Sequence, residues 1–367
     1  FLVLHLFSSE GLVLSAEMRF TNPRPNAGMT EPDTLIRQTE AYINDQVPGR
    51  SRMIMMNNLL EYSVFRELVN NPSVHFGKDG WMFYVGELCR ENYENRYPLK
   101  EEELRKMKEV LEARRDWLQE RGIRFYLVFP EMSYVIYEDK VGPRMWRYNL
   151  PSKLDQLLAY LEKESDLEVI GIHDPLMEAK DDGIMDLYYK HNSHWTHYGG
   201  YIAYREMIRH IQRDVPQTGP PMPPGEIEWV DFAVYKPDLF IVTALDQFYT
   251  TREFQPTNAG LKAHARTTYP QYPELSSREP IYTFHNSASD GPKVLLYGDS
   301  YGGFLLFYLT WNFSQTTYIY TPRFYPGVIL QEKPDIVIQE MADYMIYKIL
   351  EENPPLPAMP DSAGVNE

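Results

Sequence analysis

Residues 294–303 place a serine where nucleophilic catalysis could use it. An apolar run from Val294 to Tyr297 predicts a buried strand that ends at Gly298, and Asp299 and Ser300 follow before a predicted helix. Ligands bind at the carboxyl ends of strands in doubly wound sheets, so Ser300 would present its hydroxyl at such a crevice. The alternative is that Asp299 or Ser300 only caps the helix, as polar side chains often do there.

The turn after Ser300 offers backbone groups that could stabilise a developing negative charge. Peptide N–H groups at the start of a helix can bind an oxyanion, and here they belong to Ser300, Tyr301 and Gly302. The glycines at 298, 302 and 303 would let the backbone approach a reacting carbonyl. The pattern predicts an oxyanion site beside the candidate nucleophile.

A second segment, residues 188–199, gathers His191, His194 and His197 at three-residue spacing. On a helix successive members would lie about 60° apart and the outer two about 120° apart, so only neighbouring pairs could share a metal ion. The glycines at 199 and 200 indicate instead a turn that precedes a helix. We therefore expect no metal site, and the better functional use of one histidine is as a general base beside Ser300. The alternative is that all three are surface histidines near a helix start.

The elements predicted around these segments alternate between helix and strand, as in an α/β fold. An amphipathic helix over 99–121, a buried strand over 123–130, a helix over 152–164 and a strand over 167–172 are predicted in turn. Such alternation is typical of a parallel sheet covered by helices on both faces. A helix over 199–213, a Pro-rich loop over 216–224 and strands over 293–297, 318–320 and 335–338 continue it, whereas 229–280 reads as irregular.

The N-terminal part reads as a helical lead-in to this domain. Residues 31–69 have a helical pattern that Pro48 and Gly49 should break into two helices. Lys78, Asp79 and Gly80 predict a tight turn, followed by a strand-like aromatic run. We expect a single domain over 31–350, with an N-terminal segment at 1–30 and a Pro-rich tail at 351–367.

Composition excludes several classes of protein. The 36 basic and 52 acidic side chains of the 367 residues give a formal charge of −16, which argues against nucleic acid as a partner. The single cysteine, Cys89, excludes an intramolecular disulfide and a Cys-rich metal site, and fits the cytoplasm or the periplasm. No apolar run of about 20 residues is present. The apolar residues 1–7 could be the remnant of a removed anchor or signal segment, or simply a first strand.

Taken together, the motifs resemble the SGNH-hydrolase-like O-acetyltransferases of the alginate type (AlgJ/AlgX). The resemblance rests on Gly-Asp-Ser-Tyr-Gly at 298–302, on His-Trp-Thr at 194–196 lying upstream of it, and on Gly-Lys-Asp-Gly-Trp-Met-Phe-Tyr at 77–84. Residues 44–50 and 333–338 also match short segments of that family. The agreement runs in order from about Asn44 to Tyr347.

The resemblance implies a role for each site residue. Ser300 corresponds to the nucleophile and His194 to the general base, while Asn192 stands where the family has the third residue, an aspartate. An asparagine can hold the imidazole ring but carries no charge to stabilise an imidazolium. Either Asn192 suffices, or Asp186 or Asp174 serves instead, or catalysis is weak. The segment after the strand at 123–130 also lacks a lysine that the family usually has, which puts substrate contacts there in doubt.

The activity implied is O-acetylation of the hydroxyls of an extracellular polysaccharide through an acetyl-serine intermediate. No P-loop or GxGxxG motif is present, so no cofactor is expected. The resemblance further implies a polysaccharide acceptor, a membrane-bound acyltransferase as acetyl donor, and a periplasmic or otherwise extracytoplasmic location, with anchoring through a missing N-terminal segment compatible with it. A carbohydrate acetylesterase and a non-catalytic polysaccharide-binding or assembly subunit are the alternatives.

Overall fold

A computed structural model of the chain describes residues 13–14, 19–20, 22–25, 32–68, 71–86, 88–234, 237–257, 265–268, 272–276, 279–351 and 356. The apolar residues 1–7 lie outside the described residues, as does nearly all of the Pro-rich tail. Among the described residues, no helix combines the length and the apolar character needed to cross a membrane.

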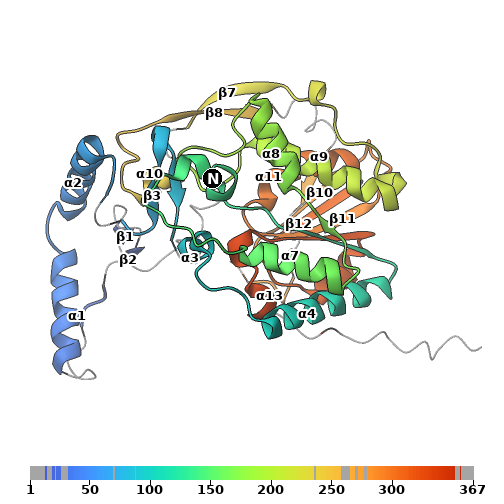
Figure 1. Cartoon of the computed structure of the whole chain (residues 1–367), viewed down its shortest axis with the longest axis horizontal. Coiled ribbons are helices and arrows are strands. Elements are labelled where there is room, and N and C mark those ends of the chain that lie inside the picture. The colour runs from blue at the N-terminus through green and yellow to red at the C-terminus, as the bar shows by residue number, and fades with distance from the viewer. Residues whose placement is uncertain are drawn as a thin grey trace, which may run out of the picture.

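A seven-stranded sheet forms the centre of the molecule (Figure 1). Its strand order is β6-β5-β13-β11-β12-β10-β9. The first five strands of that order pair in parallel, whereas β10 and β9 pair in antiparallel fashion at one edge. The bounds are β5 Arg124–Val128, β6 Val169–Ile170, β9 Ala265–Thr268, β10 Ile281–Asn286, β11 Lys293–Gly298, β12 Gln315–Tyr320 and β13 Ile336–Glu340.

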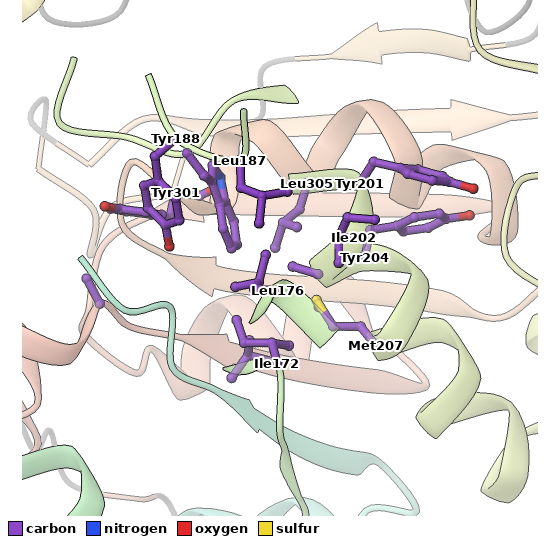
Figure 2. Packing of buried hydrophobic residues seen from close by; sticks show 14 of the residues in the cluster. Ile172, Leu176, Leu187, Tyr188, Tyr201, Ile202, Tyr204, Met207, Tyr301 and Leu305 are labelled. Atoms are coloured by element: carbon purple, nitrogen blue, oxygen red, sulfur yellow. The ribbon is translucent and has the colours of Figure 1, made fainter. Parts of the chain in front are cut away.

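Helices cover both faces of this sheet, as the sequence predicts. Alternate side chains of β11 point to opposite faces, so Leu295 packs with α4 (Glu101–Gln119) and α7 (Lys153–Glu164). Leu296 packs with α9 (His197–Asp214) and α11 (Gly302–Asn312) on the other face. Figure 2 shows part of this second cluster, which includes Tyr201, Met207 and Leu305. The doubly covered α/β fold is therefore confirmed.

Shorter helices fill the connections between these elements. Their bounds are α3 Cys89–Glu94, α5 Ser133–Ile136, α6 Glu138–Val141, α8 His173–Asp182, α10 Asp238–Val242, α12 Pro326–Glu332 and α13 Lys348–Glu351. Single 3₁₀ turns occur at Lys78–Gly80, Pro216–Thr218, Pro224–Glu226 and Asp343–Met345, two of them in the segment expected to be a Pro-rich loop.

The N-terminal helices form as predicted and extend away from the sheet (Figure 1). The helices α1 (Pro32–Asp45) and α2 (Arg50–Phe65) are separated at Pro48 and Gly49, and Gly49 has the positive φ of 78° that favours glycine. A small strand pair, β1 (Val13–Leu14) and β2 (Arg19–Phe20), precedes them.

A hairpin of β3 (Val74–Phe76) and β4 (Met82–Tyr84) joins this part to the domain, as expected. Its turn has positive φ angles at Asp79 and Gly80. Trp81 follows the turn and stacks on Tyr137 with a ring separation of 4.2 Å. The hairpin thereby packs onto the cluster that also contains α9 and α11.

The region expected to be irregular contains regular structure that the sequence pattern did not indicate. The strands β7 (Trp229–Val234) and β8 (Thr251–Pro256) form an antiparallel hairpin that runs along the edge of the molecule towards α10, with β8 against α9 (Figure 1). Exposed side chains such as Phe232 and Phe254 interrupt the usual alternation of apolar and polar residues. The segment between the two strands carries α10, which contributes to the site described next.

Candidate active site

Ser300 lies at the carboxyl end of β11, the middle strand of the seven-stranded sheet. The chain passes from β11 to β12 on one side and returns to β13 on the other. Strand order therefore reverses at β11, and open α/β sheets bind their ligands at such a point. The turn at Asp299 and Ser300 leads directly into α11, as the sequence predicts.

His194 and Ser300 face each other across this edge of the sheet. The Nε2 atom of His194 lies 2.6 Å from the Oγ atom of Ser300, so the predicted hydrogen-bond contact is confirmed. His194 lies in the loop that the isolated bridge of Tyr188 with Trp195 closes, just before the start of α9. A base from one loop and a hydroxyl from a strand–helix turn thus meet in the geometry that activates a serine.

Asn192 lies beside the other ring nitrogen of His194. Its Oδ1 atom is 2.7 Å from Nδ1 of His194 and also accepts the backbone N–H of His194 at 3.1 Å. The backbone bond fixes which way the amide points, because only its oxygen can accept from an N–H. Nδ1 then carries the proton and Nε2 is free to accept the proton of Ser300.

A carboxylate that the sequence did not reveal completes the surroundings of the histidine. Asp238, the first residue of α10, has its Oδ2 atom 3.7 Å from Nδ1 of His194. The same carboxylate accepts the hydroxyl of Ser193 at 2.6 Å and the backbone N–H of Ser193 at 3.1 Å. Asp238 therefore occupies the position for which Asp186 and Asp174 were the sequence candidates.

Those two aspartates lie elsewhere. The carboxylate of Asp186 is more than half exposed and lies 4.0 Å from Lys190, and Asp174 belongs to the first turn of α8. No sequence signal pointed to Asp238, because an aspartate at the start of a helix is common for reasons of capping and helix dipole alone.

Burial tunes the ionisation of this group of residues. Burial lowers the pKa of His194 below its ordinary value, while the negative charge of Asp238 opposes that shift. Burial likewise raises the pKa of Asp238, against the effects of His194 and of the hydrogen bonds from Ser193. His194 is consequently neutral near pH 7, the form required of a general base.

The backbone donors differ from the predicted oxyanion site. The N–H of Tyr301 donates to Oδ1 of Asp299 at 2.9 Å, and the N–H of Gly302 donates to the carbonyl of Asp299 at 3.1 Å. Both are therefore already occupied by Asp299. The N-cap residue of α11 is Tyr301 and no side chain caps it, so the alternative that Asp299 or Ser300 caps the helix is not confirmed. Of the three predicted donors, only the N–H of Ser300 makes no hydrogen bond to a described residue.

Aromatic side chains enclose the reacting groups. The ring of His194 lies 5.4 Å from that of Tyr301 and 5.7 Å from that of Phe304. The hydroxyl of Tyr301 donates to the carbonyl of Ser193 at 2.8 Å, and the indole N–H of Trp195 donates to the carbonyl of Tyr301 at 3.2 Å. These two bonds hold the His194 loop against the Ser300 turn, and Tyr301 packs beside Tyr188 in Figure 2.

The other two histidines of the segment do not join the site as bases. His191 stacks on Phe240 with ring centroids 4.7 Å apart, and burial lowers its pKa to about 4. His197 is the first residue of α9, lies against Phe304 and also has a pKa lowered by burial to about 4. Among the described residues, no three His, Cys, Asp or Glu side chains are grouped so that they could hold a metal ion.

Comparisons with known proteins agree with this geometry. Residues 74–316 match the family described as "SGNH hydrolase-like domain, acetyltransferase AlgX". The "probable alginate O-acetylase AlgJ" of Pseudomonas syringae pv. tomato is 23% identical over 282 residues, which are 76% of this chain. The chain spans 64% of the length of that relative.

Solved structures share the fold at low sequence identity. Bacillus cereus PatB1 superposes with a TM-score of 0.54 at 13% identity, over 73% of this chain and 95% of that chain. A DHHW family protein of Eubacterium siraeum superposes with a TM-score of 0.50 at 11% identity, over 67% of this chain and 88% of that chain. Since the family match covers well over half of the sequence, the chain belongs to the SGNH hydrolase-like family of the acetyltransferase AlgX.

Proposed function

We propose that the protein is an O-acetyltransferase that acetylates hydroxyls of an extracellular polysaccharide through an acetyl-serine intermediate. The observation that carries this proposal is the 2.6 Å contact between Nε2 of His194 and Oγ of Ser300, in a chain that belongs to an acetyltransferase family. The name of the relative, an alginate O-acetylase, supports a polysaccharide as acceptor.

The first half-reaction would load the acetyl group onto the serine. Oγ of Ser300 attacks the carbonyl carbon of an acetyl donor while its proton passes to Nε2 of His194. The backbone N–H of Ser300 is free to donate to the oxyanion that forms. Collapse of this intermediate breaks the bond to the donor, whose leaving oxygen takes the proton from His194, and acetyl-Ser300 remains.

The second half-reaction would repeat these steps with a sugar as nucleophile. A sugar hydroxyl gives its proton to Nε2 of His194 and attacks the acetyl-serine carbonyl. The bond to Ser300 then breaks and Oγ recovers the proton, which restores the free enzyme. In both halves His194 is transiently an imidazolium, which the Asp238 carboxylate at 3.7 Å stabilises while Asn192 keeps the ring oriented.

The proposal includes partners and a location that follow from the family resemblance. The acetyl donor would be a membrane-bound acyltransferase, and the protein would work in the periplasm or another extracytoplasmic space. The formal charge of −16 supports the expectation that nucleic acid is not a partner.

A chromogenic acetyl ester tests the proposal when it is offered with and without oligosaccharide acceptors. We expect turnover that rises with acceptor and yields an acetylated sugar, and that is abolished in Ser300→Ala. Ser63→Ala, at an exposed serine on α2, is the matched control and should keep full turnover.

Two other results would contradict the proposal. Release of acetate to water that no acceptor diverts would identify a carbohydrate acetylesterase. Absence of turnover in the native protein, together with retained binding of oligosaccharide, would identify a non-catalytic subunit.

A further inference from the structure

A fully buried glutamate lies directly beneath the turn that carries Ser300. Glu340 is the last residue of β13, the strand next to β11, and its exposed fraction is 0%. Its Oε2 atom accepts the backbone N–H of Asp299 at 3.1 Å. The acid therefore contacts the chain immediately before the candidate nucleophile.

The glycines of the turn provide room for this carboxyl group. A Cβ atom added at Gly298 or at Gly302 would come within 3.0 Å of Oε2 of Glu340. A Cβ atom at Gly303 would meet no atom within 4 Å. The structure thus corrects the expectation that the glycines admit a substrate carbonyl, because two of them admit Glu340 instead.

Hydrogen bonds of Asp299 and Glu340 link the end of β11 to the end of β13, one from each side. While Glu340 reaches from β13 to the N–H of Asp299, the Oδ2 atom of Asp299 accepts the N–H of Ala342, just beyond β13, at 2.8 Å. The hydroxyl of Tyr318 on β12 adds a third tie by donating to the carbonyl of Asp299 at 2.5 Å. The residue before Ser300 is therefore held by both neighbouring strands.

The surroundings of Glu340 favour its neutral, protonated form. Its Oε1 atom is buried and has no hydrogen-bond partner among the described residues, which a charged carboxylate would tolerate poorly. The titratable groups that face it are Asp299 and Tyr318. Burial, followed by the charge of Asp299, raises the pKa of Glu340 well above its ordinary value.

Asp299 is the better site for the negative charge of this pair. Burial raises its pKa too, but the N–H groups of Ala342 and Tyr301 and a side-chain hydrogen bond with Glu340 act in the opposite direction.

We propose that Glu340 is a positioning residue, whose hydrogen bond from the backbone N–H of Asp299 fixes the turn that presents Ser300 to His194. For its effect on activity the inference rests on the proposed function. For the geometry of the turn it stands on the contacts of Glu340 alone.

Hydrogen exchange measured by mass spectrometry tests the turn without any need for catalysis. Glu340→Ala removes the acceptor of the Asp299 N–H, so exchange in a peptide covering residues 298–304 should rise at least tenfold. Glu340→Gln keeps an acceptor oxygen and should restore most of the protection. Asp343→Ala is the matched control, because Asp343 is an equally buried acid that bonds Asn92 and not the turn, and it should leave this peptide unchanged.

Turnover of the chromogenic ester provides the second measurement. Glu340→Ala should lower kcat at least tenfold with little change in KM, and Glu340→Gln should recover most of that loss. The melting temperature of Glu340→Gln minus that of the native protein should also grow as the pH increases from about 4.5. In this range the native acid keeps its proton in the folded state but loses it in the unfolded state, so the native protein loses stability that the glutamine variant retains.

The possible failures are distinguishable. Unchanged exchange at residues 298–304 in a folded Glu340→Ala variant would overturn the positioning role, whatever the activity. Two results would overturn the claim that Glu340 is protonated in the folded protein. One is that Glu340→Gln loses as much exchange protection as Glu340→Ala, and the other is a melting-temperature difference that does not grow with pH. Absence of ester turnover in the native protein, with the expected exchange pattern intact, would refute the proposed function and leave the positioning of the turn standing.

Discussion

Asp238 approaches the same ring nitrogen of His194 that Asn192 already binds, at 3.7 Å against 2.7 Å. An amide therefore orients the ring, and a separate carboxylate supplies the charge. In a Ser-His-Asp triad one aspartate performs both tasks. Under the proposed function, this division would keep a negative charge at the site although Asn192 stands where the family resemblance implies an aspartate.

Asp238→Asn should lower ester turnover by about 10- to 100-fold. In a protease triad, changing the aspartate to asparagine lowers kcat by about 10⁴-fold. The loss should be smaller here, because Asn192 would still hold the ring in its correct tautomer. The kcat of the variant should be compared with that of Asp246→Asn, a partly buried aspartate eight residues further along the chain. Equal rates in the two variants would exclude Asp238 from the reaction.

Asn192→Asp should leave ester turnover unchanged or lower it. Asp238 already supplies a negative charge next to His194, so a second carboxylate adds repulsion between like charges. In the double variant with Asp238→Asn the new aspartate is the only carboxylate at Nδ1, and turnover should recover relative to Asp238→Asn. A double-mutant cycle measures this coupling. An increased rate in the single variant would show that Asp238 does not support the histidine.

The acid limb of the pH profile of kcat/KM should have its midpoint below about 6.5, the ordinary pKa of histidine. Burial lowers the pKa of His194, so the base stays neutral and active as the pH falls through that value. Since Asp238 raises this pKa, Asp238→Asn should shift the midpoint to a still lower pH. A midpoint above 6.5 in the native protein would contradict the dominance of burial.

Gly298→Ala should reduce the melting temperature by several degrees or prevent folding. The added methyl group would come within 3.0 Å of the carboxyl of Glu340, which is fully buried and hydrogen-bonded to Asp299. Gly303→Ala, five residues along, meets no atom within 4 Å and should melt as the native protein does. Thermal unfolding followed by circular dichroism compares them, and equal melting temperatures would be inconsistent with a tightly packed Glu340.

Trp81→Ala should lower the melting temperature by several degrees. The side chain is 2% exposed and stacks on Tyr137, and truncating a buried aromatic residue typically costs about 3–5 kcal/mol. Trp146, which is 71% exposed, provides the control through Trp146→Ala. If Trp81→Ala melts normally but loses ester turnover, the hairpin at 77–84 is part of the site and not a structural element.

Local patterns in the sequence were sufficient for the elements that surround the nucleophile. The unbroken apolar run of β11 marks a strand buried on both faces, and the glycine after it marks its end. The amphipathic period of α4 and the Pro48–Gly49 break between α1 and α2 are equally local signals. These features depend on residues close together in the chain, so no tertiary information was needed.

The remaining features depend on contacts between distant segments. The sequence pattern did not indicate the antiparallel edge, because β9 lies in the region 229–280 that reads as irregular and no strand was predicted at β10, just after it. Asp238 became a site residue only because α10 packs beside the His194 loop, where Leu239 donates its N–H to the carbonyl of His191. The N–H groups expected to be free after Ser300 donate to Asp299 instead, and the sequence alone does not show which acceptor a backbone N–H will bind.

The base and the nucleophile are 106 residues apart in the chain, with Asp238 between them. Closing so long a loop costs chain entropy that only contacts of the completed sheet can offset, so this contact has no local precursor during folding. A nascent chain that has not yet reached β11 carries His194 and Asp238 but no Ser300. Ser300 is therefore the last of these three residues to be synthesised, and the contact with His194 can form only after β11 has been made.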